Sequence, residues 1–146
     1  MFKNAEPSQS IGLQFWSVYS KWQLRVISCL KPLNITHTQF VVLTAILWLE
    51  DQHQIVTQAS VVAITGIDKM TLSKSLKNLV FQGVVVKGKN ESDSRSLILR
   101  LSNDGELLTK KALFLIEKLD EEFFGIIGQK KENDFRELLL EYKKCL

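Results

Sequence analysis

The sequence is poor in cysteine, proline and histidine, and it contains none of the common cofactor-binding motifs. Its 146 residues include two cysteines, two prolines and two histidines. No G-x-G-x-x-G, P-loop, C-x-x-C or H-E-x-x-H pattern occurs, and no constellation of a nucleophile with a base is evident. We therefore expect no cofactor, no bound metal and no enzymatic activity.

The few residues that could carry redox or metal chemistry are scattered. The two cysteines, Cys29 and Cys145, cannot make a disulfide framework, which favours a reducing cytoplasm, and we expect both thiols to be inert. His37 and His53 are isolated from each other and from any cluster of Cys, Asp or Glu. They therefore do not indicate a zinc site.

Long apolar runs are also absent. The best candidate, Phe40–Leu49, has ten residues and is interrupted by Thr44, so it is too short to span a bilayer. Met1–Ser10 lacks the apolar segment of a secretory signal. With 45% hydrophobic and 24% charged residues, the chain has the composition of one globular domain, and its length fits a single domain over residues 1–146.

The net charge of +3 is distributed unevenly along the chain. Residues 55–100 contain seven Lys or Arg against three Asp or Glu, a balance of +4. Residues 1–54 have a balance of +1, and residues 101–146 have a balance of −2. A basic middle third favours an anionic partner, and nucleic acid is the leading candidate.

Apolar spacing and capping signals predict a mainly helical chain. Thr36 and Gln39 fit a capping box, and Thr57 and Asp68 fit N-caps of two short helices. In the first of these short helices, Ala59, Val62 and Ala63 are small enough for close packing. The predicted helices cover residues 8–30, 37–49, 58–65, 69–82, 103–125 and 130–144.

A hairpin is predicted directly after the helix 69–82. Val84–Val86 is typical of a strand, residues 88–94 form a polar loop, and Arg95–Leu101 alternates with Leu97, Leu99 and Leu101 on one side. Two short helices joined by a glycine turn and followed by such a hairpin make a winged helix-turn-helix. The expected fold class is mainly α with a small β-hairpin wing, flanked by N- and C-terminal helices.

Four short motifs follow one another along the chain, namely Ile35-Thr36-His37-Thr38-Gln39-Phe40, Thr71-Leu72-Ser73-Lys74, Asp93-Ser94-Arg95 and Leu101-Ser102-Asn103-Asp104-Gly105. In this order they resemble the MarR family of bacterial transcription regulators, over residues 34–112. The chain departs from the family pattern at Lys74, where arginine is usual, and its wing is less rich in arginine, with Lys89 and Arg95 as the main cations. A lysine is less suited than an arginine to bidentate reading of guanine.

The resemblance implies a homodimeric, sequence-specific DNA-binding regulator, with a repressor favoured over an activator. A winged helix-turn-helix core would cover about 34–102, with dimerisation helices over about 8–31 and 103–146. The recognition helix, about 69–82, would enter the major groove of a pseudo-palindromic operator, and the wing, about 84–101, would meet the minor groove. The expected DNA-binding residues are Lys69, Met70, Thr71, Ser73, Lys74, Lys77, Lys89, Asp93 and Arg95.

The residues themselves allow plainer interpretations. The polar face of the helix 69–82 could be an ordinary solvated face, although no acidic residue lies between Lys69 and Lys89. Arg95 could be a surface charge paired with Asp93. A winged-helix adaptor that binds another protein, without sequence-specific DNA binding, is the alternative function. The apolar residues of both terminal segments exceed what a small core needs, which favours a homodimer.

Further properties of the family give expectations about ligands and location. Many members bind small phenolic or other aromatic effectors, for which Trp16, Tyr19, Trp22 and Trp48 are the candidate lining, although aromatics at helical spacing also suit a core. Some members sense peroxide through a cysteine near a position that falls at about Gly12 here, so that route is not expected. The implied location is the cytoplasm, in association with the nucleoid.

Overall fold

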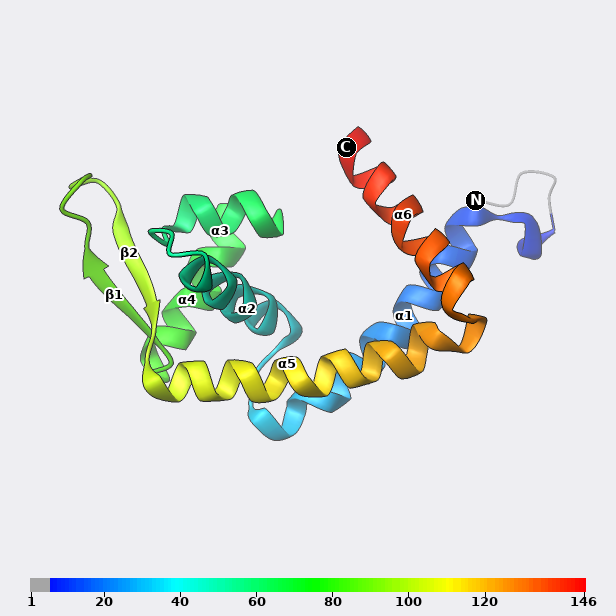
Figure 1. The fold of residues 1–146 in the computed structure, drawn as a ribbon, viewed down its shortest axis with the longest axis horizontal. Helices are drawn as coiled ribbons and strands as arrows, with labels where there is room; N and C mark the ends of the chain where they lie inside the picture. Colours follow the sequence, from blue (N-terminus) through cyan, green and yellow to red (C-terminus); the bar gives the residue numbers. More distant parts are fainter. Residues whose placement is uncertain (1–5) are drawn as a thin grey trace. The chain divides into compact units, whose positions relative to one another are not determined.

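The computed structural model describes residues 6–146, which form six α-helices and one two-stranded sheet (Figure 1). The first five residues of Met1–Ser10, the segment tested for a secretory signal, lie outside the described residues. The chain divides into two compact units, one of residues 27–114 and one that joins residues 6–26 to residues 115–146. Helices α1 (Ile11–Leu30) and α5 (Asn103–Phe124) contribute to both units. The predicted fold class is confirmed.

Helix α2 (His37–Asp51) is the central helix of the unit of residues 27–114. The Thr36 hydroxyl accepts the Gln39 N–H at 3.1 Å, and the Gln39 side chain accepts the Thr36 N–H at 2.9 Å, so the predicted capping box is present. The helix packs against α3, α4 and the wing. Its side chains on this side, including Leu43, Ile46 and Leu49, are fully buried. Burial of this apolar face is the main stabilisation of the unit.

Helices α3 (Gln58–Thr65) and α4 (Lys69–Phe81) form the helix-turn-helix. The predicted caps at Thr57 and Asp68 are both present. Gly66, between the helices, has φ = +70°, a left-handed conformation that glycine adopts without strain. Helix α4 turns its apolar face inward and ends at Phe81, with Gln82 as its C-cap, close to the predicted boundary.

The packing of α3 differs from expectation. Val61 is fully buried, whereas Ala59 and Ala63 are exposed and Val62 is half-buried. The prediction that Ala59, Val62 and Ala63 would pack closely is therefore wrong. In a helix of two turns, one narrow face reaches α2 and α4, and on that face a branched side chain fills the space better than an alanine does.

The wing is an antiparallel hairpin of β1 (Val85–Lys89) and β2 (Leu97–Leu101), with Val85 opposite Leu101 and Lys89 opposite Leu97. It lies beside α4 (Figure 1). Strand β1 extends past the predicted end at Val86, because beyond Val85 the strand is solvent-exposed and accepts polar residues. Of the three leucines expected on one side, only Leu99 is buried, since the hairpin projects from the core toward its tip.

The start of α5 packs directly on the chain that leaves α4. Ser102 donates its hydroxyl to the Gly83 carbonyl at 2.6 Å and its N–H to the Val84 carbonyl at 3.1 Å. A Cβ added at Gly105 would lie 1.9 Å from the Val84 carbonyl oxygen. Only glycine permits this approach, so Gly105 fixes how closely α5 and the base of the wing meet.

The second unit is held by an aromatic cluster that α1, α5 and α6 (Gln129–Cys145) share. Trp22 donates its indole N–H to the Asp120 carboxylate at 2.8 Å, and its ring lies 6.2 Å from that of Phe124. Phe124 also lies 6.1 Å from Phe135 on α6, measured between ring centroids.

Within residues 6–146, no single helix is long and apolar enough to cross a membrane, and only α1 and α2 taken together reach that length and composition.

Replacement of Gly105 by alanine should lower the free energy of unfolding by about 2 kcal/mol or more, because the new methyl group overlaps the Val84 carbonyl. Gly12→Ala is the matched control: nothing lies within 4 Å of a Cβ at this helical position, so a small gain of about 0.5–1 kcal/mol is expected. Urea unfolding at one fixed protein concentration measures both. A Gly105→Ala protein as stable as the wild type would contradict the close approach.

Candidate nucleic-acid interface

Helix α4 presents one continuous exposed face. Its inward residues Leu72, Leu76 and Leu79 are fully buried. Within residues 6–146, its lysines have no ion-pair partner, and the helix itself contains no acidic residue. The face is therefore both accessible and positively charged. All six residues of α4 that the sequence predicts as contacts are exposed, namely Lys69, Met70, Thr71, Ser73, Lys74 and Lys77.

The N-terminus of α4 is fixed by Asp68. Its carboxylate accepts the Thr71 N–H at 2.9 Å through one oxygen and the Thr71 hydroxyl at 2.6 Å through the other. Both bonds lower the pKa of Asp68 below its usual value, and the bond from the Thr71 hydroxyl has the larger effect. The carboxylate is therefore charged at neutral pH. Thr71 is thereby held in one orientation at the exposed start of the helix.

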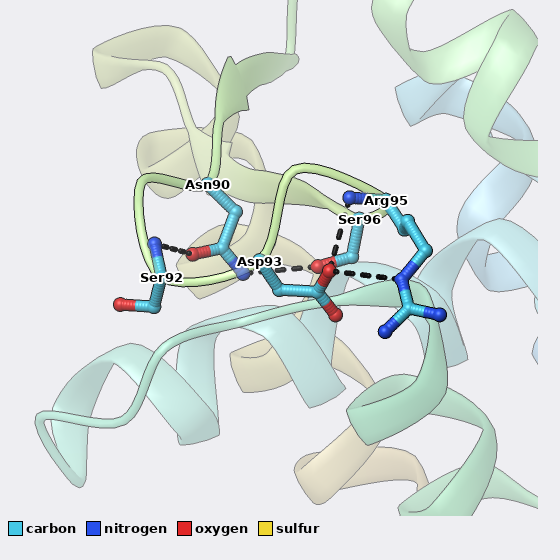
Figure 2. Close-up of polar contacts among 5 residues, drawn as sticks. All are labelled: Asn90, Ser92, Asp93, Arg95 and Ser96. Carbon is cyan, nitrogen blue, oxygen red and sulfur yellow. Dashed lines mark hydrogen bonds and ion pairs between the residues drawn. The ribbon is translucent and has the colours of Figure 1, made fainter.

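A small network orders the tip of the wing. Figure 2 shows the side chain of Asn90 between two backbone turns: its amide donates to the Ser96 hydroxyl at 2.9 Å and its carbonyl accepts the Ser92 N–H at 3.1 Å. Asp93 accepts the Arg95 N–H at 3.0 Å, and the same oxygen lies 3.6 Å from the Arg95 Nε. Asn90 is buried, with 7% of its surface exposed. The tip is therefore a structured loop.

The cations of the wing lie beside this network. The Arg95 side chain is 94% exposed, so its ion pair with Asp93 contributes little to stability and leaves the guanidinium available. Lys89, at the end of β1, is also exposed. Lys89, Asp93 and Arg95 thus lie on one hairpin, where a hydrogen bond and an ion pair join Asp93 to Arg95.

Glu50 supports the base of the wing and was missed by the sequence analysis. Its carboxylate accepts the Leu101 N–H at 3.1 Å. Burial raises the pKa of Glu50, and the bond from Leu101 partly opposes this shift because it favours the charged form. Glu50 and Leu101 are 51 residues apart, and no local signal in the sequence joins them. Asn90 was also missed, although asparagine is a common turn residue.

The four aromatic residues predicted to line an effector site are only partly brought together. Tyr19 and Trp22 lie 6.1 Å apart on α1, and Trp16 on the same helix is 62% exposed. Trp48, on α2, belongs to the unit of residues 27–114, whereas the other three belong to the second unit. None of the four lines either of two cavities, one of about 440 Å³ within the second unit and one of about 270 Å³ beside Glu50.

The described residues show no arrangement suited to a metal ion. No group of three or more His, Cys, Asp or Glu side chains that could hold one occurs within residues 6–146. Cys29 is a half-buried free thiol and Cys145 an exposed one.

Comparison with known proteins identifies the family. A family model described as an ArnR1-like winged-helix domain matches residues 31–118. The uncharacterized HTH-type transcriptional regulator YdcH of Bacillus subtilis (strain 168) is 31% identical over 131 residues, which covers 90% of this chain and 88% of that protein. The chain belongs to the MarR family of winged helix-turn-helix transcription regulators, as its motifs suggested, and proteins of this family and fold are regulators rather than enzymes.

Solved structures of the family have the same fold. CouR bound to a 23-mer DNA duplex superposes with a TM-score of 0.84 at 22% identity, over 98% of this chain and 99% of that chain. CouR from Rhodococcus jostii RHA1 bound to p-coumaroyl-CoA gives 0.80 at 23% identity, over 94% and 93% of the two chains. A mutant MarR from E. coli, complexed with operator DNA, gives 0.76 at 25% identity, over 90% and 91%.

Asn90→Ala should loosen the wing tip without unfolding the protein. The Ser92 N–H and the Ser96 hydroxyl lose their partner, so amide hydrogen exchange over residues 91–96 should accelerate about tenfold. Ser94→Ala, at an exposed side chain that forms no hydrogen bond among the described residues, is the control and should leave exchange unchanged. Equal exchange in both variants would mean that Asn90 does not order the tip.

Proposed function

We propose that this MarR-type transcription regulator is a homodimeric repressor that binds a pseudo-palindromic operator with α4 in the major groove. The observation that carries the proposal is the exposed face of α4, where Lys69, Lys74 and Lys77 have no ion-pair partner within residues 6–146. Lysines of this kind bind backbone phosphates, while short side chains such as Thr71 and Ser73 let the helix approach base edges. Met70 supplies an apolar contact for a thymine methyl group.

The wing adds a second contact at the flank of each half-site. Arg95 extends from an ordered tip, Asp93 orients it, and Lys89 lies on the same hairpin. A minor groove narrowed by A·T-rich sequence attracts an arginine most strongly. Arg95 in the minor groove, with Lys89 on a phosphate, is the arrangement that we propose.

Dimerisation is proposed through the unit of residues 6–26 and 115–146. Large apolar side chains are exposed on its helices, which is costly for a monomer. A two-fold dimer would present two copies of α4 to half-sites about 10 bp apart. The exposed apolar residues include Phe15, Trp16, Val18, Leu138, Leu139, Leu140 and Tyr142.

A small aromatic effector is proposed as the signal that releases the operator. The complex of CouR with p-coumaroyl-CoA supports this class of ligand. The candidate contacts here are Trp16, Tyr19 and Trp22 of α1 or, separately, Trp48 of α2 in the other unit. A repressor bound to its operator would be located in the cytoplasm, in association with the nucleoid, and we include this location in the proposal. The second candidate function, a winged-helix adaptor for another protein, draws on the same exposed apolar side chains and predicts no preference among DNA sequences.

Lys77→Ala should weaken binding to all duplexes alike and flatten the plot of log affinity against log salt by about one unit per site, because one phosphate contact is lost. Arg95→Ala should weaken binding most on duplexes with A·T-rich flanks. The measurement is a salt titration on cognate, scrambled and flank-swapped duplexes. Lys144→Ala, at the far C-terminus of the chain, is the control. If both test variants keep the wild-type DNA affinity and salt slope, this face does not bind DNA, and the adaptor becomes the preferred function in place of the repressor.

Deletion of residues 130–146 should give a monomeric or insoluble protein, because it removes α6 and uncovers the aromatic cluster at Phe124. Deletion of Cys145 and Leu146 alone is the control and should leave a soluble dimer. Sedimentation velocity at several concentrations distinguishes the species. A soluble dimer that persists without residues 130–146 would refute the proposed interface.

A further inference from the structure

Of the two hydroxyl residues proposed to approach base edges, Thr71 and Ser73, only Thr71 already donates its hydroxyl hydrogen to a partner within residues 6–146. The Thr71 oxygen lies 2.6 Å from one carboxylate oxygen of Asp68. An ionised carboxylate can only accept hydrogen bonds, so the threonine hydroxyl must be the donor in this pair. The second carboxylate oxygen accepts the Thr71 N–H at 2.9 Å, which fixes the carboxylate plane and prevents it from turning away.

This bond determines what Thr71 can offer to a ligand. A hydroxyl has one hydrogen and two lone pairs, and a free threonine serves either as donor or as acceptor. Here the hydrogen points to Asp68, so only lone pairs remain for any group that approaches from the exposed side. Charge-assisted bonds of this kind are roughly twice as strong as neutral ones, so a neutral base atom does not displace the carboxylate.

The position of Thr71 makes this restriction relevant to DNA. It lies in the first turn of α4, and the N-terminal residues of a recognition helix are those that contact base edges. In the major groove, adenine and cytosine present an amino donor, whereas guanine and thymine present a carbonyl acceptor. A group that can only accept distinguishes these two pairs of bases.

We propose that Thr71 selects an amino base, adenine or cytosine, at one position of each half-site, and that Asp68 is the positioning residue that sets this polarity. The inference rests on the proposed function, because it requires α4 in the major groove. Ser73 provides the contrast: its hydroxyl has no hydrogen-bond partner among residues 6–146, so it can turn to donate or accept and imposes no such choice.

The test begins with the full-length wild-type protein and a pool of randomised duplexes, from which its preferred sequence is selected. Each position of that sequence is then changed to all four bases, and affinities are measured for the wild type, Thr71→Val, Asp68→Asn and Ser73→Ala. Valine keeps the shape of threonine without the hydroxyl. Asparagine caps a helix as well as aspartate, and when its carbonyl accepts the Thr71 N–H its amide must donate to the Thr71 oxygen. That arrangement frees the threonine hydrogen.

At one position per half-site, the wild type should prefer amino over carbonyl bases by about three- to tenfold, as expected for one hydrogen bond. Thr71→Val should reduce this preference to within about twofold, and Asp68→Asn should shift it toward guanine and thymine. Ser73→Ala should leave the preference at that position unchanged. Helix content and the unfolding midpoint of each variant confirm that the cap has survived.

The contradicting outcomes separate the two proposals. If the wild type binds specifically but Thr71→Val keeps its full base profile, Thr71 does not read a base and this inference fails alone. If Thr71→Val loses the preference while Asp68→Asn retains the preference for amino bases, Asp68 does not set the polarity, and the inference is likewise overturned. If the wild type selects no sequence at all, the proposed function fails together with this inference.

Discussion

The winged helix depends on the close contact between the start of α5 and the chain that links α4 to the wing. At this contact, Ser102 bonds to the carbonyls of Gly83 and Val84, and its hydroxyl accepts the Gly105 N–H at 3.0 Å. The absence of a side chain at Gly105 lets the two backbones meet. The end of α4, the base of β1 and the first turn of α5 are thereby fixed to one another through short-range contacts.

A second set of hydrogen bonds holds strand β2 of the wing. Glu50, at the end of α2, holds the Leu101 N–H, and the Leu99 N–H bonds to the Val56 carbonyl at 2.8 Å. Strand β2 is thus tied both to α2 and to the segment before α3. The bonds of Leu99 and Leu101 at the base of the wing, together with the Asn90 network at its tip, order both ends of the hairpin. An arginine carried on such a hairpin loses less conformational entropy on binding than one on a disordered loop.

The local elements could be predicted from the sequence because their signals are local. The caps at Thr36, Thr57 and Asp68 each depend on residues three positions apart, and the apolar spacing of α4 identified its exposed face. The exposed positions of Lys74 and Lys77 follow from the same spacing. The polar composition of residues 88–94 obscured the end of β1, because an exposed strand carries little apolar signal.

The long-range contacts could not be predicted in the same way. Glu50 with Leu101, and Trp22 with Asp120, join positions 51 and 98 residues apart, and no periodicity connects them. The sequence showed Gly105 only as part of a motif. The requirement for glycine comes from the Val84 carbonyl, which belongs to another segment and leaves no space for a side chain. For Asp68 the cap was predictable, but the capture of the Thr71 hydroxyl required the geometry of the folded helix.

The central claim is that the exposed face of α4 enters the major groove while Arg95 reaches the minor groove. Dimethyl sulfate footprinting of the full-length protein on its selected duplex tests both parts, because the reagent modifies guanine N7 in the major groove and adenine N3 in the minor groove. We predict protection of guanine N7 at two half-sites about 10 bp apart, with adenine N3 protected in the flanks. Uniform protection along the duplex, or none at saturating protein, would contradict the account.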